Sequence, residues 1–232
     1  GRTETSRNIF LEDLPYTVIK DDPFDVQNPK NPNAIWTVSY PKSPVETQLS
    51  NRLKTNIKSS LATRGYSTAD SDICINSIKE MSVQYNDSGR VDSGRIIVVL
   101  DAKRTATGQF ETIEEAVALT KNNARSILNV KSLLFTVTDT GSSYLVTGGG
   151  FGHGVGMSQY GAQYMATLGY GYEAILDFYY PGTTLSNLDM VSPPPTPTTE
   201  PTSAPTSGPT QTSKPFPRPS SGPSPTTSPA PG

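Results

Sequence analysis

Between residues 35 and 40 the chain alternates apolar and polar side chains, so that Trp36, Val38 and Tyr40 share one face. A period of two is typical of a half-buried β-strand. The spacing then changes to three and four residues, the period of a helix with one buried face. This stripe consists of Val45, Leu49, Leu53, Ile57 and Leu61. Ser43-Pro44-Val45-Glu46 has the form of a capping box with proline at the first helical position, and Gly65 is placed to end the helix.

The middle of the chain continues with apolar runs of strand length. Strands are predicted at Ile73–Ile78, Met81–Tyr85 and Ile96–Leu100. Thr112-Ile113-Glu114-Glu115 then has the form of a second capping box and predicts a second helix. Its buried face would be formed by Ile113, Ala116, Val117, Thr120, Ala124, Ile127 and Leu128.

Two more strands and two shorter helices complete the pattern. Leu133–Val137 and Ser143–Val146 alternate as strands do. Ser158 is placed to cap one helix, and Pro181-Gly182 to end the other. The apolar faces of these helices are Gly161, Tyr164, Met165 and Leu168, and Ile175, Phe178 and Tyr179; we expect Tyr164, Met165, Tyr179 and Tyr180 in the core. The mixed order of elements predicts one α+β domain over residues 1–190, without internal repeats.

The C-terminal part of the chain has a different composition. Residues 193–232 hold 14 of the 21 prolines, many threonines and serines, and only three charged side chains. Such a chain buries too little apolar surface to offset its ordering entropy, and its prolines favour extended polyproline II. Residues 191–232 are therefore predicted to be a disordered linker leading to a further module. A low-complexity terminus without a partner module is the alternative.

Charge and cysteine content exclude several functions. The formal net charge of −2 offers no basic field for nucleic acid, and no apolar run is long enough to span a membrane. The single cysteine, Cys74, excludes an internal disulfide and a multi-cysteine zinc site. Because its neighbours Ile73 and Ile75 are apolar, we expect a buried thiol. We expect neither a metal nor a cofactor.

The most informative segment begins at residue 148, where six glycines fall within nine residues. Glycine at this density suits a backbone that adopts positive φ or lies against a ligand. The loop leads into the helix capped by Ser158, so free N–H groups face the same place. It lacks the lysine of a phosphate-binding loop, which favours a polar ligand such as a sugar. The candidate groove residues are Gly152, His153, Gly154, Gly156, Ser158, Gln159 and Tyr160.

Each candidate side chain also has a plainer interpretation. His153 is the only histidine, and a lone histidine in a loop is more often structural or solvated than functional. Ser158 alternatively serves only as a helix cap. Glu173 and Asp177 are expected to be solvated charges on a helix surface.

Residues 150–185 resemble the C-terminal signature of the SpoIID/LytB family. The matching pattern is G-x-GHGVGMSQYGA followed by MA-x-x-G-x-x-Y-x-x-IL-x-x-YYPGT-x-L, with Phe178 standing where the family commonly has a polar residue. Gly1-Arg2-Thr3-Glu4 is similar to the family's Gly-Gly-x-Thr-Glu segment, which adds Thr3 and Glu4 to the groove candidates. Further matches are Leu14-Pro15-Tyr16, Asp22-Pro23, Trp36, Ser93-Gly94-Arg95, Arg125, Lys131-Ser132 and Phe135.

The resemblance implies a murein lytic transglycosylase that cleaves between N-acetylmuramic acid and N-acetylglucosamine in glycan strands stripped of peptide. One glutamate would protonate the leaving oxygen and then deprotonate the 6-hydroxyl of the sugar, giving a 1,6-anhydro product. In the family this glutamate precedes the Gly-Gly-x-Thr-Glu segment. The resemblance therefore implies that the chain is the C-terminal part of the domain, that the catalytic acid lies upstream of Gly1, and that the chain alone is inactive.

Two other functions fit the same resemblance. LytB-type members enhance cell-wall amidases without cutting glycan, and a glycan-binding wall module is the third interpretation. In each case the expected partners are peptidoglycan strands, with a cell-wall amidase in the second. The implied location is the cell wall or envelope of a bacterium, after secretion, in sporulation or in general wall remodelling.

Overall fold

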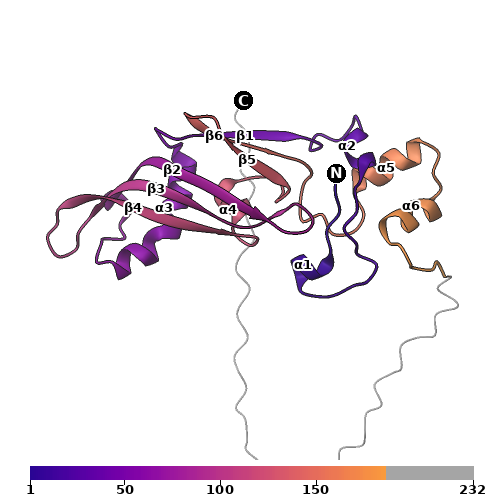
Figure 1. Ribbon diagram of the computed structural model, residues 1–232, viewed down its shortest axis with the longest axis horizontal. Coiled ribbons are helices and arrows are strands. Elements are labelled where there is room, and N and C mark those ends of the chain that lie inside the picture. Colours follow the sequence, from indigo (N-terminus) through magenta and orange to yellow (C-terminus); the bar gives the residue numbers. More distant parts are fainter. Residues whose placement is uncertain (187–232) are drawn as a thin grey trace, which may run out of the picture. The chain divides into compact units, whose positions relative to one another are not determined.

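The computed structural model describes residues 1–186, and the predicted linker at residues 191–232 lies outside the described residues. Within the described part, two three-stranded antiparallel sheets and a set of helices form the predicted α+β fold (Figure 1). The larger sheet has the order β2-β3-β4 and the smaller one the order β1-β6-β5. No helix in residues 1–186 combines the length and apolarity that a bilayer crossing requires.

The larger sheet consists of β2 (Ile73–Tyr85), β3 (Val91–Lys103) and β4 (Phe110–Thr120). The two strands predicted at residues 73–85 form a single strand, because register shifts after Ile75 and Ile78 absorb the break in apolar alternation. Ile96–Leu100 is the middle of β3, as predicted. Residues 86–90 connect β2 to β3 and, as shown below, reach the candidate site.

The helix predicted from the second capping box is wrong. Residues 110–120 form β4, which pairs with β3 along its whole length, and only a short helix, α4 (Ala124–Leu128), follows. Val117 and Leu119 alternate on the buried face, a period of two that pairing with β3 selects over the helical spacing. Glu115 shares this face and is buried, where it accepts a hydrogen bond from the Ser60 hydroxyl at 2.7 Å and pairs with Arg64.

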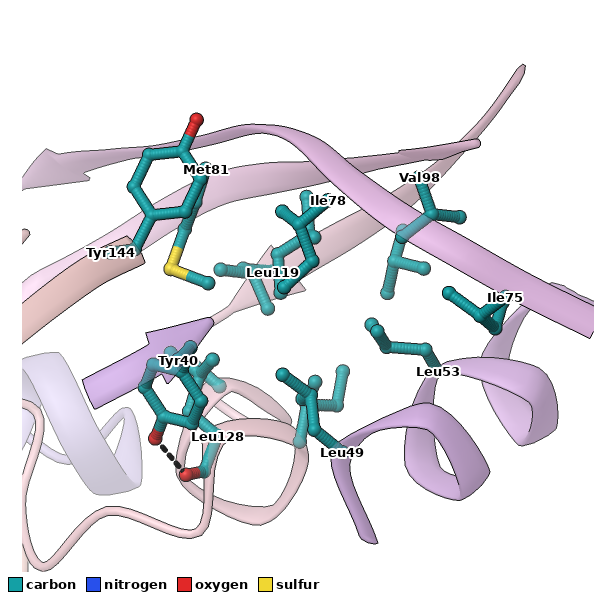
Figure 2. Close-up of a cluster of buried hydrophobic side chains, with 14 of the residues drawn as sticks. Tyr40, Leu49, Leu53, Ile75, Ile78, Met81, Val98, Leu119, Leu128 and Tyr144 are labelled. Carbon is teal, nitrogen blue, oxygen red and sulfur yellow. Dashed lines mark hydrogen bonds between the residues drawn. The ribbon is translucent and has the colours of Figure 1, made fainter. Parts of the chain in front are cut away.

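The main core lies between the larger sheet and α3 (Thr47–Thr63) (Figure 2). The predicted stripe is confirmed, because its last four members, Leu49, Leu53, Ile57 and Leu61, are fully buried. The predicted start of the helix is wrong: Glu46, not Ser43, is the N-cap, and its carboxylate accepts the N–H groups of Gln48 and Leu49. A carboxylate satisfies two free donors there, where the serine would satisfy one.

The smaller sheet consists of β1 (Trp36–Pro41), β5 (Phe135–Asp139) and β6 (Ser143–Gly148), close to the predicted ranges. The hydroxyl of Tyr144 donates to the carbonyl of Lys79 at 3.1 Å, which fastens this sheet to β2. Trp36 lies opposite Gly148, and a side chain at Gly148 would overlap the indole ring. This close approach fixes the point where β6 leaves the sheet and the glycine-rich loop, residues 148–158, begins.

Four short helices lie around that loop. They are α1 (Ser6–Phe10), α2 (Pro23–Gln27), α5 (Gln159–Thr167) and α6 (Tyr172–Tyr179); a 3-10 turn, η1 (Asp70–Asp72), precedes β2. The sequence predicted α5 with its Ser158 cap and α6, but not α1 or α2. Of the tyrosines and methionine expected in the core, Met165 and Tyr179 are buried, whereas Tyr164 and Tyr180 are half-buried.

Cys74 is exposed, which corrects the prediction of a buried thiol. Its neighbours Ile73 and Ile75 are buried, and successive residues of a strand point to opposite faces. The apolar neighbours therefore place Cys74 on the outer face of the sheet.

Candidate functional site

A cavity of about 550 Å³ lies where three segments of the chain meet. Its main walls come from the N-terminal residues 1–3, from residues between Asp22 and Asn33, and from residues 149–160, and Arg90, Ser132 and Leu134 complete the lining. The predicted groove residues Gly152, His153, Gly154, Gly156, Ser158, Gln159, Tyr160 and Thr3 all line it. Glu4 is the exception, because its side chain lies behind the wall and is fully buried.

The backbone of the glycine-rich loop forms most of one wall. Gly150, Gly152, Gly154 and Gly156 have φ values of 74°, 94°, 82° and 80°, so that every second residue is left-handed. Residues with a Cβ rarely adopt this conformation, which explains the spacing of the glycines. Gly150 N–H donates to the carbonyl of Asn33 at 2.7 Å and Gly152 N–H to that of Lys131 at 2.9 Å. The wall is therefore anchored to its neighbours and not a free loop.

The imidazole of His153 lies exposed at the edge of the cavity. Its Nδ1 accepts the N–H of Val155 at 2.9 Å, so in the neutral ring the proton resides on Nε2. Nε2 has no partner among residues 1–186 and can donate to a ligand. The ring also makes a T-shaped contact with Phe10, with the ring centres 5.3 Å apart.

Glu4 is the centre of a buried polar network behind the loop. Four groups donate to its carboxylate: the Thr5 N–H, the amides of Asn8 and Asn86, and the hydroxyl of Ser88. Burial by itself raises the pKa of Glu4, but the hydrogen bonds from Ser88, Asn86, Thr5 and Asn8 outweigh it and hold the pKa below its usual value. A buried carboxylate that stays ionised accepts hydrogen bonds and does not deliver protons.

Arg90 connects this network to the cavity. Its guanidinium lies 4.0 Å from the Glu4 carboxylate and donates to the carbonyls of Arg2 at 2.6 Å and Thr3 at 3.2 Å. The same guanidinium packs against Gly154, whose carbonyl accepts the N–H of Glu4 at 2.9 Å. One ion pair therefore holds together the N-terminal residues, the β2–β3 turn and the glycine-rich loop.

The chain holds two Ser-Gly-Arg triplets, and the resemblance matched the second of them, Ser93-Gly94-Arg95. Ser93-Gly94-Arg95 lies within β3, where Arg95 forms an exposed pair with Glu80. The triplet that reaches the site is Ser88-Gly89-Arg90, five residues earlier. Asn86-Asp87-Ser88-Gly89 is a turn sequence before a strand, but it does not indicate that the side chain of Arg90 reaches the site.

Asp22 and Asp25 form a second polar group that lines the cavity, and sequence reasoning did not assign them to the site. Ser158 caps α5 by accepting Gly161 N–H at 3.0 Å and also donates to Asp25 at 2.6 Å. The buried Asp22 caps α2 through Asp25 N–H and accepts the Tyr179 hydroxyl at 2.8 Å. Burial raises the pKa of Asp22, more than its hydrogen bonds from Tyr179 and Asp25 lower it.

Replacing Asp22 with asparagine is expected to leave the free energy of unfolding at pH 7 unchanged or up to about 1 kcal/mol higher. Asparagine keeps a capping oxygen and can pair with Tyr179, yet carries no charge. Because the folded pKa of Asp22 is raised, its favourable contribution is full below the unfolded pKa of about 3.9 and is lost as pH rises through the folded pKa. Any gain of the variant should therefore grow between pH 4 and pH 7.

Urea denaturation at both pH values measures this gain. Asp22→Ala should lose about 2 kcal/mol, since the cap and the partner of Tyr179 both disappear. Asp21→Asn is the matched control, because Asp21 is the adjacent residue and its carboxylate is exposed. An asparagine variant as unstable as the alanine variant would contradict the prediction.

Comparison with known proteins finds one matching family model and several similar bacterial proteins. Residues 28–156 match the family model described as Domain of unknown function (DUF8618). A Bacillus subtilis (strain 168) protein named Amidase enhancer is 29% identical over 206 residues, covering 81% of this chain and 28% of its own length. Stage II sporulation protein D of Bacillus amyloliquefaciens is 30% identical over 165 residues, 69% of this chain and 42% of its own. The Bacillus subtilis (strain 168) protein of that name is 46% identical over 65 residues, which cover 28% of this chain and 19% of its own length. The chain thus spans less than half the length of each relative.

Proposed function

This chain belongs to the DUF8618 family and to the SpoIID/LytB proteins, and on that premise we propose that its cavity binds the glycan strands of bacterial peptidoglycan. The observation that carries the proposal is the left-handed glycine wall with His153 at its edge. Glycines at alternate positions let a broad ligand lie against backbone, and Nε2 of His153 offers a donor to it. A volume of about 550 Å³ suits a few sugar units.

The polar character of the walls supports a sugar over an apolar ligand. Asp25 and Ser158 present a carboxylate and a hydroxyl, and the start of α5 presents backbone N–H groups near Gln159. Acetamido sugars carry hydroxyl donors, carbonyl acceptors and flat C–H faces, so these groups are complementary to them. No three His, Cys, Asp or Glu side chains of residues 1–186 gather closely enough to hold a metal ion, and the proposal involves none.

The reaction we propose for the bound strand is lytic transglycosylation between N-acetylmuramic acid and N-acetylglucosamine. It requires one carboxylic acid that first gives and then takes a proton. Glu4 is unsuited to this role, because it is fully buried, accepts four hydrogen bonds and has a lowered pKa. In this proposal Glu4 supports the groove, and the residues of the cavity bind and orient the strand.

An amidase enhancer is the second candidate function, favoured by the similarity to the Bacillus subtilis protein over 81% of this chain. In that case the same cavity would hold glycan while the chain stimulates a cell-wall amidase. Both candidates place the protein in the bacterial cell envelope, outside the membrane, in sporulation or in wall remodelling.

The test is to incubate the purified chain with peptidoglycan stripped of its peptides and, in parallel, with intact peptidoglycan, and to measure co-sedimentation and the released products. We expect binding in all cases. Release of 1,6-anhydro sugars from the stripped strands would show that the chain itself carries a catalytic acid, against the expectation from the resemblance. Faster release of peptides from intact peptidoglycan by an added amidase would support the enhancer. A chain that does not sediment with stripped strands would refute the proposed function.

Replacing His153 with alanine is expected to weaken binding to stripped glycan at least tenfold, about 1.4 kcal/mol. The melting temperature should stay within a few degrees, because the ring is exposed and contacts only the Val155 N–H and the exposed ring of Phe10. His153→Gln should recover part of the affinity by restoring a donor. Asn122→Ala, at an exposed turn, is the control. Unchanged affinity in His153→Ala would remove His153 from the binding site.

A further inference from the structure

Two large aromatic side chains near His153 are exposed to solvent, although phenylalanine is more stable when buried. Phe151 is 71% exposed and Phe10 is 57% exposed. Burying a phenylalanine ring stabilises a protein. Phe151 lines the cavity and Phe10 contacts His153 at its edge, so a ligand seated there could cover both exposed rings.

The local backbone holds Phe10 in this exposed position. Phe10 is the last residue of α1, and Leu11, which follows, has φ 62° and is 83% exposed. A left-handed leucine is strained, and such strain is found mostly where function requires it. The helix is itself fastened, because the Lys121 ammonium donates to the Asn8 carbonyl at 2.8 Å. The short helix that carries Phe10 is therefore held in place by a hydrogen bond to Lys121.

Phe151 is braced in a different way. It lines the cavity directly, between the left-handed Gly150 and Gly152. The guanidinium of Arg125, on α4, lies over the ring with its central carbon 6.0 Å from the ring centre. A cation on one face leaves the other face of Phe151 free for a ligand.

We propose that Phe10 and Phe151 are stacking platforms for the pyranose rings of an acetamido-sugar strand, close to the donor His153. This inference rests on the proposed function and names the residues that would grip its ligand. A sugar ring is amphipathic: its C–H face packs on an aromatic ring while its acetamido and hydroxyl groups point sideways to donors. The contact between Phe10 and His153 places an aromatic ring next to a hydrogen-bond donor. A sugar can use both groups at once, whereas an apolar protein partner would need only the ring.

The experiment uses isothermal titration of the full chain with stripped glycan strands and with a soluble N-acetylglucosamine tetramer. Phe10→Ala and Phe151→Ala should each weaken binding about five- to tenfold, and the double variant more. Tyrosine at either position should keep most of the affinity. Phe110→Ala is the matched control, since Phe110 is 54% exposed but lies on β4. Melting temperatures of all variants should agree within a few degrees.

The outcomes separate the two proposals. If the unaltered chain binds neither probe, the proposed function fails and this inference falls with it. If it binds and both alanine variants bind equally well, only the stacking platforms are refuted. Variants that bind glycan normally but no longer stimulate an added amidase would show that the rings face a protein, which also overturns the inference.

Discussion

Glu4→Gln is expected to lower the free energy of unfolding by about 3 kcal/mol, although glutamine has almost the same shape. The substitution replaces an oxygen acceptor with an amide group that faces donors. It also removes the negative charge 4.0 Å from the buried guanidinium of Arg90. Because the carboxylate is fully buried, water cannot replace it. The loss should appear in chemical denaturation at pH 7.

The pH dependence identifies the charge as the cause. The folded pKa of Glu4 is lowered, so its stabilising contribution is present above the unfolded pKa of about 4.3 and is lost as pH falls through the folded pKa. The gap between Glu4→Gln and the unaltered chain should therefore be full at pH 6–7 and shrink in stronger acid. Glu12→Gln, at an exposed position, should change stability by less than about 0.5 kcal/mol. A gap independent of pH would contradict this origin.

Gly154→Ala is expected to cost about 3 kcal/mol of stability and to abolish most glycan binding. The left-handed φ of 82° accounts for about 1 kcal/mol. The new Cβ would also overlap Nη2 of Arg90 and lie 2.7 Å from Cζ, which must displace the guanidinium that supports the cavity. The substitution thus strains the loop and disturbs its support together.

Gly152→Ala is the matched control, because it has a similar φ of 94° but no atom within 4 Å of the new Cβ. It should lose only the backbone contribution of about 1 kcal/mol. Denaturation midpoints of the two variants measure the stability effect. Glycan binding of Gly154→Ala is compared with that of the unaltered chain, because Gly152 itself lines the cavity. Equal losses in the two variants would show that contact with Arg90 is unimportant.

The elements that sequence reasoning found are those whose signal is local. The stripe of α3 and the cap of α5 depend on neighbours a few residues away, and both are present. β4 was missed because Ile113 and Val117 fit a helical spacing as well as an alternating one. Pairing with β3, a partner outside the window, decided between them.

For the candidate site, too, the sequence revealed the local feature and missed the residues that only the fold brings to it. The glycine-rich loop was recognisable because its composition is unusual and contiguous. Arg90, Asp22 and Asp25 were missed as site residues, because only the fold brings the β2–β3 turn and α2 to that loop. Glu4 was expected in the groove, yet the fold turns it inward to meet Arg90. The direction of the Glu4 side chain depends on Arg90, which is distant in the sequence, so local sequence patterns could not predict it.

Met165 and Tyr179 are buried, yet they lie apart from the main core cluster. The helices that carry them are fastened to the N-terminal segment: the Asn28 amide donates to the Tyr160 carbonyl at 2.8 Å and the Lys20 ammonium to that of Phe178 at 3.0 Å. The cavity is therefore lined in part by a small packed unit outside the main core cluster, and we expect this unit to open at a lower free energy than the sheets. A ligand seated there would bind only the closed arrangement, and by mass action it would protect α5 and α6 from exchange with solvent before it protected the sheets.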